Sequence, residues 1–333
     1  MIDGISIIVP VYNSASTIER CARSLMALSP AALELIFVDD ASQDESVEIL
    51  TRLAKLPESQ GLMRIVSLSK NGGPGGARNV GMRAAKGRWC AFVDADDWVE
   101  PGYLQPLIEH GLAAGDFVIS GIEYNHKDGK GDGYRLFQQN ILQTNAMSPQ
   151  DMLCVIMYSY PVAKLFDLEL IREFGLEFPS TLIHEDTLFV LRYLRHAKKV
   201  VFSSRAQYHY MLMTDNSLTK RLYRPEEYRR LADLFRAEWE LFFRFFDVKP
   251  LALRSAIQRY GLSQLLQAVY SQYKYGDVSR ESRLDNIVAV RAARHHFDKY
   301  YKPSCLRNRM MLFFLLRLPV SFCDFLATFV LSK

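Results

Sequence analysis

The sequence predicts an α/β protein in which a mostly parallel sheet has helices on both faces and is followed by a mainly helical C-terminal extension. Three observations support this fold class. Strand and helix patterns alternate over roughly the first 100 residues, the order that produces a parallel sheet with helical crossovers. Polar and acidic residues follow the ends of three of the strand patterns. From about Pro225 onward the pattern is almost wholly helical.

The strand patterns are short runs rich in β-branched residues. The first is Ile5 to Val9, and Pro10 is expected to end it because proline has no N–H to donate to a sheet. Further strands are predicted at 33–38, 65–68, 89–93 and 117–123. A polar turn at 127–133 followed by 134–137 is typical of a hairpin that returns beside the last of these strands.

Capping signals and apolar periodicity predict helices between the strands. Ser16 and Glu19 have the spacing of a capping box at the start of the first helix, and Ser42 is expected to open the second. The glycine-rich stretch 72–76 leads into a third helix that runs through Ala85. Each helix would connect one strand to the next across a face of the sheet.

Length and composition indicate an ordinary globular protein of about two domains. The chain has 333 residues, of which 49% are hydrophobic and 23% charged, enough to bury a core without disulfides. The five cysteines are scattered and never spaced C-x-x-C, so neither a zinc site nor a disulfide framework is expected, and a reducing compartment is favoured. The sequence begins without a basic segment before an apolar one, so no signal peptide is expected.

The net charge of +4 is less informative than its location. Basic residues cluster between Lys220 and Arg230 and again between Lys299 and Arg309, just before an apolar C-terminus. These clusters fit either a solvated surface or attraction to anionic lipid or an acidic glycan. Nucleic-acid binding is not expected, because no nucleic-acid-binding motif accompanies the charge.

The C-terminal segment from Met310 to Leu331 is strongly apolar, but it contains Arg317, Pro319 and Asp324. A charged residue near the centre of a spanning helix costs about 2.5–3.5 kcal/mol, and proline interrupts helical hydrogen bonding. We therefore expect a segment that lies at the membrane surface. A helix packed on the protein and a membrane-spanning helix are the alternatives.

The segment Asp94-Ala95-Asp96-Asp97 directly follows the strand at 89–93. Carboxylates crowded at a strand end repel one another unless a cation or hydrogen-bond donors share the site. Hard oxygen ligands suit magnesium or manganese, which also bridge to substrate phosphates. The alternative is a turn in which Asp97 caps a helix expected after Pro101.

Asp39 and Asp40 follow the second strand. An acid at this position can hydrogen-bond a ribose or a base, in dehydrogenases as well as in other nucleotide-binding folds. A dehydrogenase also needs a G-x-G-x-x-G turn straight after the first strand, where this chain has Pro10-Val11-Tyr12-Asn13. The sequence therefore argues against a nicotinamide cofactor.

Two further segments offer polar groups at the start of a helix. The stretch from Gly72 to Asn79 either cradles a phosphate on its backbone amides or uses its glycines only to form a tight turn. Within it, Arg78 lies where its guanidinium group would face a diphosphate or a base. Glu185 and Asp186 precede an apolar helix pattern, where they either cap the helix or take a proton from an acceptor hydroxyl.

The order and spacing of five motifs resemble those of the family-2 inverting glycosyltransferases, whose nucleotide-binding fold is the Rossmann-like GT-A fold. The five are the opening strand Ile7–Asn13, the V-D-D-x-S turn Val38–Ser42, the N-x-G…A-R-N-x-G segment Asn71–Gly81, the D-x-D motif within Phe92–Asp97 and the E-D-x-x-F segment Glu185–Phe189. The resemblance is densest over roughly the first 100 residues and fades beyond about residue 220.

The resemblance implies a role for each motif. Asp186 would be the catalytic base, with Glu185 beside it as support or competitor, and Asp96 would hold Mn²⁺ or Mg²⁺ on the diphosphate. The residues lining the nucleotide-sugar site would be Pro10, Tyr12, Asp40, Arg78 and Asp94. Of these, Asp40 would accept from the uracil ring, with Arg78 near the base and Asp94 near the ribose.

Weaker candidates for the same site are Asn13, Asn79, Asp97, Lys164 and His209. Lys164 matches a recurring K-L segment of the family to which we assign no role. His209 is either part of a segment that closes over the donor or a packed core histidine.

The implied enzyme transfers a hexose or N-acetylhexosamine from a UDP-sugar to a hydroxyl of a glycan or lipid-linked glycan, such as a capsule, O-antigen or lipopolysaccharide-core intermediate. A single displacement would invert the anomeric configuration. Residues 1–125 would bind the nucleotide sugar, 126–222 would form the acceptor side, and 223–333 would form the helical extension, with a membrane-associating tail from about 303. We expect a cytoplasmic protein, peripheral on the inner face of the cytoplasmic membrane.

A sugar-phosphate nucleotidyltransferase and an inactive scaffold are the alternatives to a glycosyltransferase. A sugar-phosphate nucleotidyltransferase would share the fold class and the metal, but it needs a glycine-rich, basic loop straight after the first strand, which the sequence lacks. A catalytically inactive, membrane-tethered scaffold would keep the fold without the chemistry. Asp94, Asp96 and Asp186 argue against the scaffold, and measured turnover of a UDP-sugar would decide.

Overall fold

The computed structural model describes residues 4–28, 33–59, 61–108, 113–125, 131–135, 140–143, 160–180 and 185–211, together with 279–281, 283–284, 287–288 and 319. The chain divides into two compact units. The first comprises Met1–Met147, Ser159–Ser180 and Glu185–Asp215, and the second comprises Ser148–Tyr158, Thr181–His184 and Asn216–Lys333. The predicted helical extension, the two basic clusters and the apolar tail lie almost entirely outside the described residues, so the fold below is that of the first unit.

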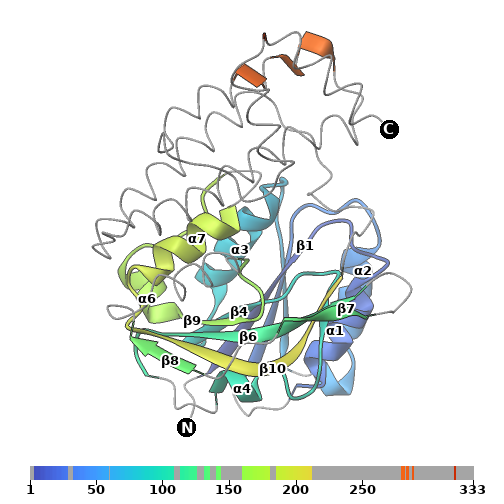
Figure 1. Ribbon diagram of the computed structural model, residues 1–333. Coiled ribbons are helices and arrows are strands. Elements are labelled where there is room, and N and C mark those ends of the chain that lie inside the picture. Colours follow the sequence, from blue (N-terminus) through green and yellow to red (C-terminus); the bar gives the residue numbers. More distant parts are fainter. Residues whose placement is uncertain are drawn as a thin grey trace. The chain divides into compact units, whose positions relative to one another are not determined.

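The described strands form one ten-stranded sheet, drawn in Figure 1. They are β1 (Ile5–Val11), β2 (Leu33–Asp39), β3 (Met63–Ser67), β4 (Trp89–Phe92), β5 (Trp98–Val99), β6 (Asp116–Asn125), β7 (Gly131–Arg135), β8 (Asn140–Gln143), β9 (Lys164–Asp167) and β10 (Lys199–Met211). Their order is β3-β2-β1-β4-β9-β6-β10-β5, with β7 beside β6 and β8 beside β10.

Parallel pairing dominates the first half of the sheet. β1 pairs in parallel with β2 and β4, β2 pairs in parallel with β3, and β10 pairs in parallel with β6. By contrast, β9, β5, β7 and β8 are antiparallel to their neighbours. The mostly parallel sheet expected from the sequence is therefore confirmed, with antiparallel strands added after residue 98.

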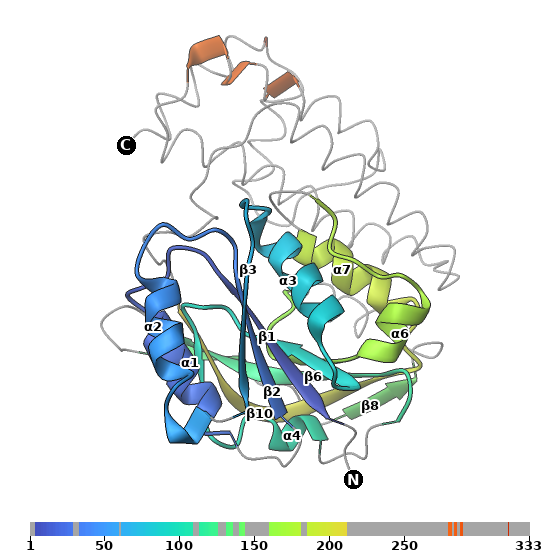
Figure 2. The same ribbon diagram turned by 180° about the vertical axis from the view of Figure 1, so that it is seen from behind.

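Helices cover both faces of this sheet, as Figures 1 and 2 show. The helices α1 (Ile18–Met26) and α2 (Ser46–Leu53) lie on one face, and α3 (Gly73–Ala84), α6 (Leu168–Glu173) and α7 (Glu185–Leu194) lie on the other. Alternation along β1 supplies both contacts, since Ile7 and Val9 join the core beneath α1 while Ile8 contacts Gly81 of α3. Two short elements complete the set, α4 (Gln105–Ile108) and a 3-10 turn at Pro57–Ser59.

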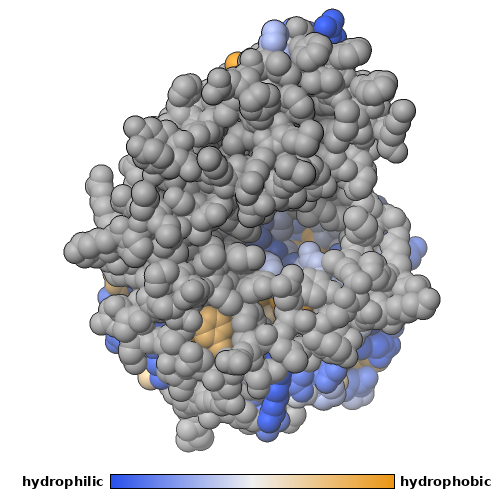
Figure 3. All heavy atoms as spheres, in the orientation of Figure 1, coloured by the Kyte–Doolittle hydropathy of each residue, from blue (hydrophilic) through white to orange (hydrophobic). Residues whose placement is uncertain are grey.

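On the face seen in Figure 3 the described surface is mainly hydrophilic. The large apolar side chains exposed in the described part of the chain are Tyr12, Phe174 and Val288. None of the helices within the described ranges combines the length and apolar character needed to cross a membrane.

Several predicted element boundaries are wrong, for identifiable reasons. β1 continues through Pro10 to Val11, because its pairing with β4 has already ended at Ile8 and only β2 still lies alongside. The capping box is absent, since α1 starts at Ile18 without a side-chain cap and Glu19 instead pairs with arginines of α1 and α2. The second helix starts at Ser46 rather than Ser42.

The glycine-rich stretch lies inside α3 rather than before it, because α3 already begins at Gly73. Two of its glycines allow close approach of neighbouring elements. A Cβ on Gly81 would lie 2.3 Å from Ile8 Cγ2 of β1, and a Cβ on Gly75 would lie 2.8 Å from Glu185 Cγ of α7. Glycine therefore lets α3 approach both the sheet and α7. The predicted hairpin is confirmed, although its second strand begins at Gly131, within the expected turn.

This packing gives a stability test. We expect Gly81→Ala to destabilise the protein by about 1–3 kcal/mol, the usual cost of forcing an extra methyl group into a packed contact. Gly76→Ala is the matched control, because a Cβ there meets nothing within 4 Å, and replacing a helical glycine by alanine gains roughly 0.5–1 kcal/mol. Urea unfolding measures both variants. Equal midpoints for the two would contradict the close approach of α3 to β1.

Candidate functional site

The predicted site residues gather where the parallel strands of the first unit end. The loops after β1, β2 and β4 lie at the same edge of the sheet, the usual place for ligands in such folds. The polar segments here are Pro10–Asn13, Asp39–Asp40 and Asp94–Asp97. The starts of α3 and α7 reach the same edge, since side chains of α3 contact both Asp94 and Glu185.

Asp40 binds the start of α3. Its Oδ1 accepts from the main-chain N–H of Gly72 at 2.7 Å, and its Oδ2 accepts from that of Gly73 at 2.8 Å. Burial raises the pKa of Asp40, while these two N–H groups oppose the shift. The carboxylate predicted to accept from uracil is thus already bonded through both oxygens, and each oxygen keeps one further lone pair for a ligand.

These contacts bear on the two alternatives for Gly72–Asn79, a phosphate cradle or a tight turn. The helix start does bind an anion, but the anion at the amides of Gly72 and Gly73 is the chain's own Asp40. The next residue is Pro74, which has no N–H. Gly75 serves packing, because a Cβ there would lie 2.8 Å from Glu185 Cγ.

Arg78 lies in a buried ion triad. Its Nη2 donates to Asp94 Oδ1 at 2.7 Å, and its Nη1 donates to Glu185 Oε1 at 3.2 Å. The guanidinium group also lies 5.4 Å from the ring centre of Phe178. Burial would lower the pKa of Arg78, but Asp94 and Glu185 raise it, so the side chain stays charged. Arg78 therefore ties the loop after β4 to the first turn of α7.

The two acids at the start of α7 have different surroundings. Glu185 is buried beside Arg78, and burial raises its pKa to about 7, with Asp186 adding to the rise and Arg78 opposing it. Asp186 is partly exposed, and its Oδ1 accepts from the main-chain N–H of Thr187 at 2.6 Å. Asp186 is thus the acid of the pair that solvent or a substrate can reach.

Asp97 anchors the acidic loop and does not cap a helix. Its Oδ2 accepts from the Tyr208 hydroxyl at 2.5 Å and its Oδ1 from the main-chain N–H of Met211 at 2.8 Å, both on β10. The same hydroxyl accepts from the main-chain N–H of Asp94 at 3.1 Å. Burial raises the pKa of Asp97 well above its usual range, and Asp96 and Asp94 add to the shift. The helix it was expected to cap begins only at Gln105.

Asp96 is the acid of this loop that the sequence predicts to hold a cation. It is partly exposed and lies near buried Asp97, whose pKa is raised mainly by burial, with Asp96 and Asp94 adding to the rise. Magnesium sites commonly use one or two carboxylates together with substrate phosphates. Within the described ranges, no three His, Cys, Asp or Glu side chains converge on a common point suited to a metal.

The loop after β1 places two of the predicted contacts differently. Tyr12 is 48% exposed, whereas Asn13 is turned into the protein with φ 48°. The Asn13 main-chain N–H donates to Ser42 Oγ, and its Oδ1 accepts from the main-chain N–H of Gln43. Asn13 therefore joins the loops after β1 and β2, while Tyr12 presents its ring to solvent.

Three of the weaker candidates have structural contacts. The Asn79 amide donates to the Phe178 carbonyl at 2.9 Å and accepts from the Phe178 N–H at 2.8 Å. Lys164 is fully buried, with its Nζ 3.3 Å from the Val162 carbonyl and 4.5 Å from the ring centre of Tyr160. His209 is buried and stacked on Trp98, which favours the packed alternative.

Sequence reasoning missed Arg20, Trp98 and Phe178. Arg20 Nη2 donates to the Asp96 carbonyl at 2.8 Å, and its guanidinium group lies over the Trp98 ring. Phe178 stacks on Phe189 of α7 with ring centres 4.0 Å apart. The side chains of Trp98 and Phe178 are apolar or lie in irregular segments, and Arg20 is one of many charged helix residues, so no local pattern singled them out.

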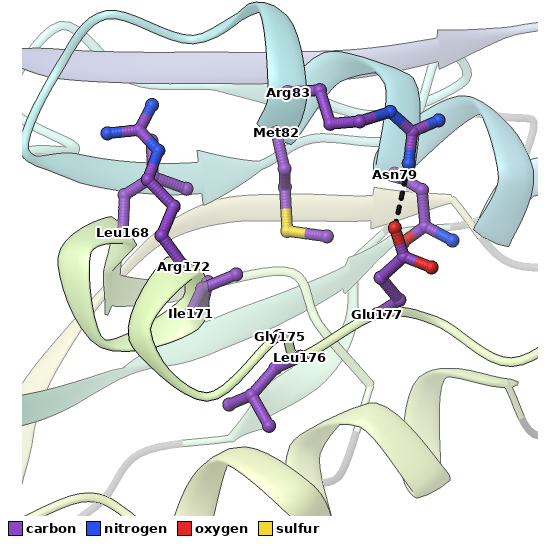
Figure 4. Close-up of a pocket in the computed structure, with 9 residues that line it drawn as sticks. All are labelled: Asn79, Met82, Arg83, Leu168, Ile171, Arg172, Gly175, Leu176 and Glu177. Carbon is purple, nitrogen blue, oxygen red and sulfur yellow. Dashed lines mark hydrogen bonds and ion pairs between the residues drawn. The ribbon is translucent and has the colours of Figure 1, made fainter.

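A separate cavity of about 300 Å³ lies between α3 and α6, as Figure 4 shows. Its walls include Met82 and Ile171, and its two arginines, Arg83 and Arg172, are bonded to other groups of the protein. Arg83 pairs with Glu177 at 2.8 Å, and Arg172 donates to the Ala85 carbonyl. None of the aspartates of the strand-end site lines this cavity, so we assign the candidate site to the strand ends.

Comparisons with known proteins identify the family of this chain. Residues 6–173 match the family model described as glycosyl transferase family 2. The succinoglycan biosynthesis protein ExoO of Rhizobium meliloti is 37% identical over 136 residues, which are 40% of this chain and 37% of that protein. The poly(ribitol-phosphate) beta-glucosyltransferase of Bacillus spizizenii is 29% identical over 238 residues, 70% of this chain and 36% of that protein. The chain thus spans little more than a third of the length of either relative.

A solved structure shows the same fold. Staphylococcus aureus TarS 1–349 in complex with UDP-GlcNAc matches 99% of this chain and 90% of its own, with a TM-score of 0.67 at 19% identity. The GT-A fold expected from the sequence is therefore confirmed.

The buried position of Glu185 gives a pH test. Folding raises the pKa of Glu185 from 4.5 to about 7, so this acid stays protonated to a higher pH in the folded chain than in the unfolded chain. Its contribution to stability is therefore complete below pH 4.5 and is lost as pH rises to about 7. We expect the free energy of unfolding of Glu185→Gln, relative to the parent chain, to rise across this window in urea titrations. The exposed Glu177→Gln is the control. A flat difference for Glu185→Gln would contradict its burial.

Proposed function

Because this chain belongs to glycosyl transferase family 2, we propose that it transfers a hexose or N-acetylhexosamine from a UDP-sugar to a hydroxyl of a glycan or lipid-linked glycan. The main observation in support is the Arg78 triad, which holds the acidic loop and the start of α7 together at the strand ends. Asp94, beside the proposed donor site, and Glu185, beside the proposed base, thus both pair with the buried guanidinium group of Arg78. The names of the two relatives, which act in succinoglycan biosynthesis and on poly(ribitol-phosphate), support a polysaccharide acceptor.

We propose a donor site built around the loops after β1, β2 and β4. Exposed Tyr12 is available to stack on the uracil ring, beside Pro10. Asp40 would receive the base through its remaining lone pairs, and Asp94 would contact the ribose while Arg78 keeps it in place. The UDP-GlcNAc complex of TarS, which has the same fold, supports a UDP-sugar as the donor. Residues 1–125 would provide most of this site, and 126–222 would provide the acceptor side.

The chemistry proposed for the chain's own residues is a single displacement. The carboxylate of Asp186 takes the proton of the acceptor hydroxyl as that oxygen attacks the anomeric carbon, and the bond from this carbon to the diphosphate oxygen breaks with its electron pair leaving on UDP. Attack from the face opposite the diphosphate inverts the configuration. Mn²⁺ or Mg²⁺ bound at Asp96 would supply charge neutralisation for the leaving diphosphate.

The contrast between the two acids supports Asp186 as the base. Glu185 already has Arg78 as a buried partner, and Gly75 of α3 packs against it. Asp186 is the more exposed of the two. We propose that Glu185 stabilises the site through its ion pair with Arg78, and that Asp186 contacts the acceptor hydroxyl. Acceptor delivery from a membrane is also proposed, with the basic and apolar tail from about residue 303 binding anionic lipid peripherally.

The metal assignment has a direct test. We expect the parent chain to hydrolyse slowly one sugar nucleotide from a panel of UDP-sugars in the presence of Mn²⁺, and Asp96→Asn to lower turnover at least 100-fold, roughly the effect of losing one key electrostatic contact. Glu177→Gln is the control, because Glu177 is an exposed acid that pairs with Arg83 beside the separate cavity and not at the strand ends. Full activity of Asp96→Asn, or of the parent chain in EDTA, would refute the metal site.

The base assignment is tested by a pair of amide substitutions. Asp186→Asn should leave UDP affinity within about twofold and lower kcat by roughly 100- to 10,000-fold, because it removes a general base without changing shape. Glu185→Gln should have the smaller effect on kcat. Isothermal titration with UDP and single-turnover assays measure the two quantities. A larger loss of kcat in Glu185→Gln than in Asp186→Asn would exchange their roles.

A further inference from the structure

Three planar side chains stack in a column beside the acidic loop. The guanidinium carbon of Arg20 lies 4.1 Å from the ring centre of Trp98, and the imidazole of His209 stacks on Trp98 with ring centres 4.7 Å apart and planes 2° from parallel. The column ends at Glu100, whose Oε1 lies 3.2 Å from His209 Nε2. We call Arg20, Trp98 and His209 the stacked column.

The column draws on three elements that are distant in sequence. Arg20 comes from α1, Trp98 from β5 and His209 from β10. β5 and β10 are paired with His209 directly opposite Trp98, so the sheet itself sets the stacking distance between these two rings. Arg20 is exposed on α1, and its guanidinium group lies over the indole ring. The indole therefore contacts both a cation and an imidazole.

The column also holds the main chain of Asp96. Arg20 Nη2 donates to the Asp96 carbonyl at 2.8 Å while its guanidinium plane rests on Trp98, two residues further along. Next to Asp96, Asp97 is bonded to Tyr208 and to Met211 of the strand that carries His209. The Asp96 carbonyl is thus held by Arg20, and the following residue, Asp97, is held by β10. The Asp96 side chain stays partly exposed.

Two alternative roles for Trp98 leave its contacts unexplained. A ring that stacks on a sugar offers a face to the ligand, whereas the Trp98 ring already contacts the Arg20 guanidinium group and the His209 imidazole. A role in packing alone would need no bond to the acidic loop, but Arg20 also donates to the Asp96 carbonyl.

We propose that Arg20 and His209 are positioning residues for the diphosphate site: through Trp98 they fix the peptide at Asp96 and so aim its carboxylate at the diphosphate and its divalent cation. This inference rests on the proposed function. It predicts a defect in binding the nucleotide together with the cation, and a smaller defect in the chemical step once both are bound.

The test measures binding in the full chain by isothermal titration of UDP in the presence of Mn²⁺. Arg20→Ala and His209→Ala should raise the Kd for UDP about three- to tenfold, in line with the loss of a cation–π or stacking contact together with its hydrogen bond. His209→Phe keeps a flat ring and should restore the Kd to within about twofold. Arg20→Lys keeps the charge but loses the planar group, so its Kd should lie between those of the parent and Arg20→Ala.

The chain offers matched controls for both residues. Arg23 of α1 is an arginine of the same helix that pairs with Glu19 instead of the loop, so Arg23→Ala should leave the Kd unchanged. His196 stacks on Phe174 with ring centres 3.9 Å apart, away from the acidic loop, so His196→Ala controls for loss of a stacked histidine. In activity assays, the Mn²⁺ concentration for half-maximal rate should rise in Arg20→Ala while kcat at saturating Mn²⁺ stays within about threefold.

Fluorescence supplies a readout that does not depend on turnover. Trp98 is one of three tryptophans, and the difference between the parent and Trp98→Phe isolates its emission. Adding UDP with Mn²⁺ should change this emission in the parent chain and in Arg23→Ala, and change it less in Arg20→Ala at the same concentrations.

The outcomes separate this proposal from the proposed function. If the parent chain binds UDP with Mn²⁺ and all column variants bind it equally well, the positioning role is wrong and the proposed function stands. If His209→Phe binds UDP as weakly as His209→Ala does, loss of stacking does not explain the weaker binding, and the role assigned to the stacked column is wrong. If the parent chain itself binds no UDP with either Mn²⁺ or Mg²⁺, both the proposed function and the inference fail. Should His209→Ala not fold, the exposed Arg20 variants decide the question.

Discussion

The candidate site depends on one buried cation, the guanidinium group of Arg78. It lies between Asp94 and Glu185, so it joins the loop after β4 to the first turn of α7 across more than 90 residues of sequence. Without that charge two buried or half-buried carboxylates would face each other, and burying an unpaired charge is costly. The contact holds both acids in place at the edge of the sheet where the strand-end loops meet.

The close packing of α3 makes this arrangement possible. Gly81 lets α3 approach β1 and Gly75 lets it approach Glu185, so Arg78, between these two glycines, is brought within reach of both carboxylates. At its start the same helix is bound by Asp40 through two main-chain N–H groups. The glycine-rich motif thus takes part in helix packing, and a protein carboxylate bonds the helix start, where the sequence pattern left open a phosphate cradle or a tight turn.

Local sequence patterns account for the order of the elements but not for the contacts between distant residues. The order of strands and helices was predictable because alternation of apolar residues marks each element, and the acids at the ends of β2 and β4 were predictable from their position. The partner of Arg78 was not, since Glu185 follows it by 107 positions and nothing local links them. The same holds for Arg20 and for Tyr208, which bind the acidic loop from other elements. The predicted end of β1 was wrong because strand pairing decides it: β1 continues through Pro10 beside β2.

The pair of hydrogen bonds between Asn79 and Phe178 limits how this chain can diverge. One end of the amide donates to the Phe178 carbonyl and the other accepts from the N–H of the same residue. Aspartate has the same shape but would set oxygen against oxygen, and glutamine would have the right groups one methylene too far out. Neither chemical relative of asparagine is thus an equivalent replacement. Asn79 therefore holds the Phe178 main chain through a contact that neither aspartate nor glutamine reproduces.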